Sequence, residues 1–235
     1  MSADAMSIDA IAGLEADRLL LGRTSTAERL ADLLRGRITE GYFVPGTRLS
    51  EEAIGGALGV SRNTLREAFR LLTHERLLVH ELNRGVFVRV LSVQDVADLY
   101  RVRKLIECAI VRSVTEPPGE RLAPVVSAVE AGEDAALRQA WRELGTADIR
   151  FHRGLVTLAN SPRTEEVMRG LLAELRLVFH VMDAPQAFHE PYLTRNREIL
   201  TALSAGDGRG AEELLSSYLD DAEHQLTTAY RARGF

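Results

Sequence analysis

A capped helix, a tight turn, a second helix and a short hairpin follow one another without a gap in residues 45–88. The first helix is predicted to begin after a Pro-Gly-Thr turn, where the Ser50 hydroxyl can accept a hydrogen bond from an unpaired amide. Gly59 has the backbone freedom that a helix end followed by a sharp turn requires. Ser61 is placed to cap the second helix in the same way. Few folds accommodate this order, and it predicts a winged helix-turn-helix.

Both predicted helices have apolar residues on one face. We expect a buried stripe of Ala53, Ile54, Ala57 and Leu58 in the first helix, and a buried face of Leu65, Ala68, Phe69 and Leu72 in the second. The first turns of the second helix carry Arg62, Asn63, Thr64 and Arg66, which lie largely on its other face. The outer start of this helix is therefore free to meet DNA.

A helix in the major groove presents its N-terminal residues to base edges, and its amide ends favour phosphates. Arg62 and Arg66 suit guanine or phosphate, whereas Asn63 suits an adenine edge. Thr64 suits a phosphate or a thymine methyl. The hairpin turns at Asn83-Arg84-Gly85, from which Arg84 could enter the minor groove or hold the DNA backbone. The candidate DNA-binding residues are Ser50, Ser61, Arg62, Asn63, Thr64, Arg66, Asn83, Arg84 and Gly85. The alternative for each of them alone is a solvated face or an ordinary hairpin.

The motifs Pro-Gly-Thr at 45–47, Gly-Val-Ser-Arg at 59–62, Arg-Glu-Ala at 66–68 and Asn-Arg-Gly at 83–85 occur together here. Their conjunction resembles the N-terminal domain of the GntR family of bacterial transcription regulators. Asn63-Thr64 stands where many members have Thr-Pro, and Glu52 lies in a helix where some members carry a DNA-facing arginine. These departures concern the operator sequence rather than the fold.

Charge divides the chain into two parts. The total is −5, but residues 24–91 carry 10 Arg against 8 acids, whereas residues 92–235 carry 17 bases against 22 acids. The basic part is therefore the one that is expected to read DNA. A local charge of +2 gives one copy little electrostatic affinity, so we expect a homodimer.

Two further features of the sequence exclude classes of protein. Cys108 is the only cysteine, so an intrachain disulfide and a four-cysteine zinc finger are excluded. No apolar run approaches the roughly 20 residues that span a membrane, and the first residues lack a secretory pattern. We expect a cytoplasmic protein without a membrane partner. Residues 1–23 are expected to be an accessory N-terminal segment.

From residue 92 onward, long segments with a helical period alternate with Pro, Gly and Asn. The fold class is therefore mostly α, with a winged helix-turn-helix in residues 24–91 and an all-α bundle of six or seven helices in residues 92–235. After a first helix at 25–40 in the winged part, the predicted helices of the bundle are 93–114, 122–131, 135–144, 146–159, 164–182, 192–205 and 210–231.

Motifs in the second part extend the resemblance to nearly the whole chain. Arg103-Lys104-Leu105-Ile106-Glu107, Asp148-Ile149-Arg150-Phe151-His152, Ala159-Asn160 and Gly206-Asp207 are similar to the FadR-like branch of the family. The resemblance implies that the helical domain binds an effector and dimerises, and that the dimer binds a pseudo-palindromic double-stranded DNA operator. Repression is commoner in this family than activation, so we expect a repressor that responds to a small organic acid or a similar metabolite.

Asp148 and His152 are four residues apart on a predicted helix, so both side chains can reach one ion. In many members of the branch two histidines complete this set, and the resemblance places their positions at Asn196 and Tyr218. Asn binds metal weakly and Tyr rarely does so at neutral pH. Two alternatives stay open: a polar pocket without metal, or a site for Zn, Ni or Mn. His189 or His180 would be the further ligands in the second case, although no spacing selects them.

The expected effector-binding residues are Arg103, Asp148, His152, Asn196 and Tyr218. Arg103 could bind a carboxylate or phosphate, or pair with Glu107 one turn later. A metal-dependent hydrolase that uses Asp148 and His152 is the alternative function. The sequence has no Gly-rich phosphate loop, nucleophile elbow or His-Glu-x-x-His pair, so we expect a regulator and not an enzyme.

Overall fold

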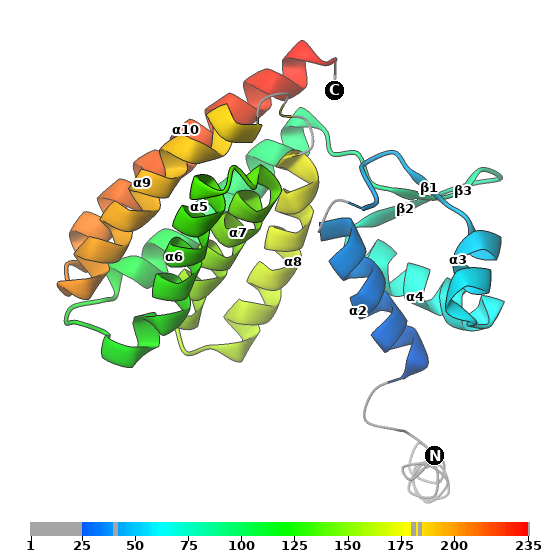
Figure 1. The fold of residues 1–235 in the computed structure, drawn as a ribbon, viewed down its shortest axis with the longest axis horizontal. Helices are drawn as coiled ribbons and strands as arrows, with labels where there is room; N and C mark the ends of the chain where they lie inside the picture. Colours follow the sequence, from blue (N-terminus) through cyan, green and yellow to red (C-terminus); the bar gives the residue numbers. More distant parts are fainter. Residues whose placement is uncertain (1–24, 40–41, 180–181, 183–184, 235) are drawn as a thin grey trace, which may run out of the picture.

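The computed structural model describes residues 25–39, 42–179, 182 and 185–234, and this part of the chain is mostly helical (Figure 1). The expected N-terminal segment, residues 1–23, lies outside the described residues. In chain order the elements are α2 (Thr26–Thr39), β1 (Arg48–Leu49), α3 (Glu51–Leu58), α4 (Arg62–His74), β2 (Leu78–Glu81), β3 (Gly85–Val88), α5 (Val93–Arg112), the 3-10 helix η1 (Gly119–Leu122), α6 (Ala123–Leu137), α7 (Trp141–Thr157), α8 (Pro162–Val178), α9 (Pro185–Ser204) and α10 (Gly208–Ala232). The prediction of a winged helix-turn-helix followed by a helical bundle is confirmed.

The small sheet is antiparallel, with the strand order β1-β3-β2. β2 and β3 form the predicted hairpin, in which Val79 lies opposite Phe87. The sequence analysis missed β1, because a strand of two residues has no periodicity. Its Arg48 pairs with Phe87, and its Leu49 pairs with Val86. β1 ends one residue before α3, so the sheet continues directly into the helix-turn-helix.

The two helices of the helix-turn-helix differ in how well their apolar faces were predicted. α4 buries Leu65, Ala68, Phe69 and Leu72, as expected. The expected buried stripe of α3 is wrong, because Ala53, Ala57 and Leu58 are exposed and Ile54 is half-buried. α3 turns Gly55 toward α4, where an added Cβ would lie 3.9 Å from the Leu65 side chain. The contact between the helices is therefore made through Ile54 and a glycine rather than through Ala57 and Leu58.

The bundle contains α5 to α10, with α5 packed against α10 and α6 against α7 (Figure 1). The sequence predicted separate helices at 122–131 and 135–144, but α6 continues through Gly132 to Leu137. Gly132 lies inside this helix and lets α9 approach closely: a Cβ there would lie 3.0 Å from the Leu193 side chain. The chain breaks instead at Gln139, whose φ is 56°.

Two arginines connect the winged part to the bundle. Arg89, which follows β3, contacts Asp95 of α5 at 2.6 Å and Glu174 of α8 at 3.1 Å. Arg176 of α8 donates a hydrogen bond to the Thr39 carbonyl at the end of α2, at 2.6 Å. A single cluster of buried apolar side chains runs through both parts. Among the described residues, no helix combines the length and apolar character that a membrane crossing needs.

Candidate DNA-reading face and buried polar network

The start of α4 is capped and exposed. The Ser61 side chain accepts a hydrogen bond from the Thr64 amide at 3.1 Å, so this hydroxyl completes the helix end. Arg62 and Asn63 are exposed, and Thr64 is half-buried against Ser61. Arg66 is exposed and forms an ion pair with Glu51 at 3.0 Å. Because exposed ion pairs contribute little stability, Arg66 can leave Glu51 for a phosphate.

The remaining candidates are Ser50, which precedes α3, and the three residues of the hairpin tip. Ser50 caps α3 by accepting from the Ala53 amide at 3.2 Å. Asn83 and Gly85 turn the hairpin with φ values of 60° and 111°. Arg84, between them, forms an ion pair with Glu81. α3 and the tip of the hairpin lie at the end of the molecule away from the bundle (Figure 1).

The five expected effector-binding residues come together in one buried network inside the bundle. They lie on α5, α7, α9 and α10, and all are at most 7% exposed. The hydrogen bonds of the network are Arg103 Nε to Glu107 Oε1 at 2.8 Å, His152 Nδ1 with Glu107 Oε2 at 2.6 Å, His152 Nε2 with the Tyr218 hydroxyl at 3.2 Å, Tyr218 to Asp148 Oδ1 at 2.8 Å, and Asn196 Nδ2 to Asp148 Oδ1 at 3.0 Å. Four helices thus converge on one chain of polar contacts.

The network keeps both of its carboxylates charged. Burial opposes the charge on Asp148, but His152, His189 and two hydrogen bonds lower the pKa of this carboxyl below its ordinary value. Burial opposes the charge on Glu107 as well, and Arg103 and His152 lower its pKa. Burial, together with Asp148, raises the pKa of Tyr218 well above 10. Tyr218 therefore keeps its proton and donates a hydrogen bond to Asp148.

The residues of the network do not fit a metal ion. The Tyr218 hydroxyl lies 2.8 Å from Asp148 Oδ1 and 3.2 Å from His152 Nε2. It therefore stands between the two side chains that an ion would have to share. Asn196 turns its amide nitrogen to Asp148, because a carboxylate can only accept, and an NH₂ group is no metal ligand. Across the described ranges, no three His, Cys, Asp or Glu side chains are grouped to hold an ion. His180, one of the further ligands considered, lies outside these ranges.

Sequence reasoning missed the central place of Glu107. It was expected at most as a salt-bridge partner of Arg103, but its two oxygens also connect Arg103 to His152. Arg103 and Glu107 are one turn apart on α5, and this spacing was the signal for the pair. Within the described part of the chain, Arg103 Nη2 and Asn196 Oδ1 are buried and have no hydrogen-bond partner. A donor and an acceptor are thus left unsatisfied at the edge of the network.

Comparisons with known proteins agree with this architecture. Residues 26–88 match the model of the gntR family of bacterial regulatory proteins, and residues 98–221 match the FCD domain. A solved transcriptional regulator from Rhodococcus sp. RHA1 is 50% identical, with a TM-score of 0.84 over 88% of this chain and 100% of that chain. The galactonate operon transcriptional repressor of Escherichia coli (strain K12) is 26% identical over 221 residues, 85% of this chain and 96% of that protein. The Nta operon transcriptional regulator of Aminobacter aminovorans is 30% identical over 135 residues, 57% of this chain and 64% of that protein.

This chain belongs to the GntR family of bacterial transcription regulators, with an FCD domain as its helical part. Regulators of this family bind operator DNA, respond to small molecules through the FCD domain and act as dimers. They are not enzymes, so the expectation of a regulator is confirmed and the hydrolase alternative is not retained.

Proposed function

We propose that this regulator represses transcription by placing the starts of two α4 helices, one from each copy, on a pseudo-palindromic operator. Arg62, Asn63 and Thr64 would contact base edges and phosphates, and Arg66 would contact a phosphate after leaving Glu51. Arg84 at the hairpin tip would contact the flanking minor groove. The single observation that carries this proposal is the capped, exposed first turn of α4. We infer a cytoplasmic location from the proposed action on operator DNA.

The test is binding of the purified protein to the DNA upstream of its own gene, measured by fluorescence anisotropy at moderate salt. Arg62→Ala is expected to weaken binding roughly five- to one-hundredfold, because it removes one base or phosphate contact. Arg70→Ala is the matched control, since Arg70 is exposed on the same helix but lies two turns later and pairs with Glu67. No binding by the wild type, or equal losses in both variants, would overturn the proposal.

The effector is proposed to be a small organic acid that also carries a hydroxyl group. Support comes from the two unsatisfied atoms of the network, because Arg103 Nη2 can donate to a carboxylate and Asn196 Oδ1 can accept from a hydroxyl. Asn196→Ala is expected to abolish the thermal stabilisation that a hydroxy acid gives to the wild type. A panel of hydroxy acids that leaves the melting temperature of the wild type unchanged would contradict this assignment.

We also propose that the network works without metal, because the Tyr218 hydroxyl takes the place of the ion. Metal analysis of wild-type protein, prepared without chelator and then exposed to zinc, nickel or manganese, should find no stoichiometric ion. The double variant Asn196→His/Tyr218→His should bind one ion per chain and melt at a higher temperature when zinc is added. A stoichiometric ion in the wild type that disappears in His152→Ala would refute the proposal.

We place the boundary between the DNA-binding domain, residues 24–91, and the effector-binding and dimerisation domain, residues 92–235, at Ser92. Support comes from the capping box that Ser92 and Asp95 form at the start of α5, which begins a new helix immediately after the hairpin.

A further inference from the structure

A pocket of about 360 Å³ lies between the two parts of the molecule, with α2 on one side and α7 and α8 on the other. We call it the interdomain pocket. Its charged lining residues are Asp32, Arg35, Arg150, Arg153, Arg169 and Arg176. None of them belongs to the buried polar network, so this is a separate site.

The interdomain pocket has an excess of positive charge. Arg35 is neutralised, because it pairs with Glu75 at 2.6 Å and with Asp32 at 2.5 Å. No ion pair within the described ranges includes Arg150, Arg153, Arg169 or Arg176. Four of the guanidinium groups that line the pocket therefore have no carboxylate partner among the described residues, in a chain whose net charge is −5.

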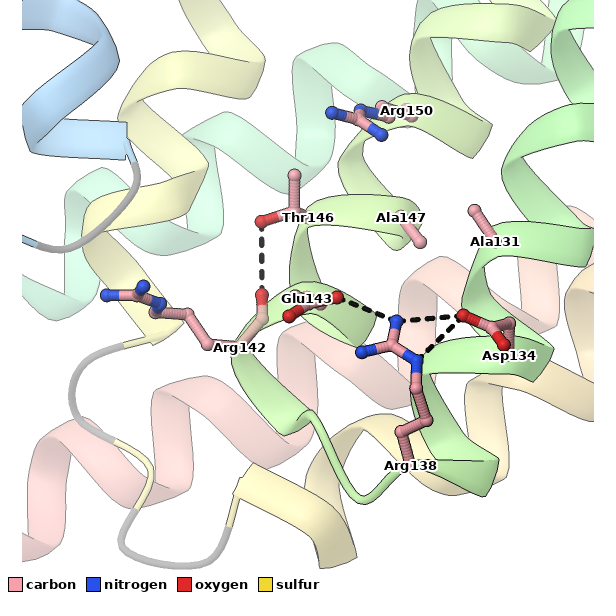
Figure 2. Close-up of a pocket in the computed structure, with 8 residues that line it drawn as sticks. All are labelled: Ala131, Asp134, Arg138, Arg142, Glu143, Thr146, Ala147 and Arg150. Carbon is pink, nitrogen blue, oxygen red and sulfur yellow. Dashed lines mark hydrogen bonds and ion pairs between the residues drawn. The ribbon is translucent and has the colours of Figure 1, made fainter.

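The neighbouring pocket, drawn in Figure 2, contains an arginine that is paired with carboxylates. Arg138 is held between Asp134 and Glu143, at 2.8 Å from each. Arg150 stands in the same view with no such partner (Figure 2). Arg150 borders both pockets, and the only carboxylate among the lining residues of the interdomain pocket, Asp32, is paired with Arg35.

Arg176 is the strongest sign that the interdomain pocket is built for an anion. It is 6% exposed, and its hydrogen bonds go to neutral acceptors: the Thr39 carbonyl at 2.6 Å, the Arg142 carbonyl at 3.0 Å and the Thr146 hydroxyl at 3.3 Å. Burial lowers the pKa of Arg176 to about 10, so it is still charged at neutral pH. A buried cation without a counter-ion is costly, and a bound anion would remove that cost.

We propose that the interdomain pocket binds a small organic molecule with at least two anionic groups, either phosphates or carboxylates. The planar fork of arginine can hold two oxygens of such a group, and Ile149 and Leu172 offer an apolar surface to the carbon skeleton. The volume is at the lower end of the usual range for small-molecule sites. Because Arg176 joins α8 to the end of α2 and to α7, the ligand would fix the placement of the DNA-binding part on the bundle.

Phosphates of operator DNA are a poorer fit to these arginines. α2 stands between α8 and α4 (Figure 1), so the pocket lies on the side of α2 away from the exposed start of α4. A freely diffusing anion can enter from this side without approaching the operator.

The test is isothermal titration of the full-length protein with pyrophosphate and, separately, with citrate at low salt. We expect one of the two to bind once per chain, and the one that binds tells whether phosphate or carboxylate is preferred. The double variant Arg153→Ala/Arg169→Ala should lose affinity tenfold or more. Arg163→Ala should bind as the wild type does, because Arg163 is an exposed arginine of α8 that does not line the pocket.

Three results would overturn the proposal: no binding of either anion, equal affinity in all three proteins, or weaker operator binding by the double variant in buffer free of both anions. The last would show that these arginines contact DNA. The titration contains no DNA, so its failure is distinct from a failure to bind the operator. If the ligand fixes the two parts as inferred, the anion that binds will change operator affinity for the wild type and for Arg163→Ala but not for the double variant.

Discussion

At the scale of single residues, the hydroxyl of Tyr218 connects the two carboxylates of the buried network. It donates to Asp148 and faces the His152 nitrogen, and His152 in turn contacts Glu107. A buried acceptor that loses its donor is penalised by more than the net contribution of one hydrogen bond. Loss of the Tyr218 hydroxyl should therefore lower the free energy of unfolding by more than the net contribution of one hydrogen bond.

Tyr218→Phe is expected to lower the free energy of unfolding by about 1–3 kcal/mol, because Asp148 then keeps a single hydrogen bond, from Asn196. Tyr192→Phe is the matched control. Its hydroxyl is buried without a partner among the described residues, so its removal should be neutral or slightly stabilising. Chemical denaturation of the three proteins measures both effects. Similar losses of stability in the two variants would show that the Tyr218 hydroxyl stabilises the protein no more than the unpartnered Tyr192 hydroxyl does.

His189 should make the stability depend on pH. Burial lowers its pKa to about 4, against an ordinary 6.5, so the unfolded chain binds this proton first. The free energy of unfolding should therefore fall as the pH is lowered from 6.5 to 4, by up to about 3 kcal/mol. Asp148 and Glu107, whose pKa values are lowered, lose their contribution at lower pH, below their ordinary pKa values of 3.8 and 4.5.

His189→Leu should remove most of the slope between pH 6.5 and 4.5, as measured by urea unfolding at several pH values. A slope in this variant equal to that of the wild type would rule out His189 as its source.

At the scale of elements, two helical glycines should respond in opposite directions to the same substitution. Gly170 lies inside α8, and an added Cβ would meet no atom within 4 Å, so Gly170→Ala should raise stability by about 0.5–1 kcal/mol. Gly208 begins α10, where a Cβ would lie 2.2 Å from the Val114 carbonyl oxygen. Gly208→Ala should destabilise the protein, since the added Cβ would force the backbone to move. Thermal melts of both variants check the pair, and a shift of the same sign in both would contradict it.

The elements that sequence reasoning found are those whose signal is local. The buried face of α4 repeats with the helical period, and Ser50 and Ser61 precede their helices, so this part was predictable. β1 and the path of α6 through Gly132 depend on contacts with β3 and α9, which no local pattern contains. The apolar residues of α3 failed as a guide for the same reason, because their own spacing does not determine whether another part of the chain covers them.

The candidate sites follow the same rule. The candidate DNA-binding residues all fall within residues 50–85 of the sequence, so their grouping could be predicted from motifs. The buried polar network gathers residues from α5 to α10. Asp148 and His152 were found through their spacing on one helix, whereas Asn196 and Tyr218 were found through the resemblance to a family. The place of Glu107 and the hydroxyl contact of Tyr218 required the packed bundle.

At the scale of the whole molecule, Arg89 is one of the two arginines that connect the DNA-binding part to the bundle. Its guanidinium contacts Glu174, which is 6% exposed. Burial raises the pKa of this carboxyl. Arg89→Ala should lower the free energy of unfolding by about 1–3 kcal/mol, because it leaves a buried carboxylate without its cation.

Glu174→Gln placed in the Arg89→Ala background should restore part of this loss, since a neutral amide is less costly to bury. Hydrogen exchange at the start of α5 should rise in the single variant and fall again in the double variant. Losses that simply add in the double variant would show that the two residues do not act as a pair.

β1 joins the hairpin to the helix-turn-helix, because it pairs with β3 and ends at Leu49, directly before Ser50, which caps α3. A strand ladder shared in this way resists bending, so the angle between α4 and the hairpin tip is set before any DNA arrives. A rigid domain of this kind does not adapt its shape to a poorly matching site. The DNA duplex must deform instead. Operators with identical contacted bases but different groove width or local twist should therefore differ in affinity, since each must deform by a different amount.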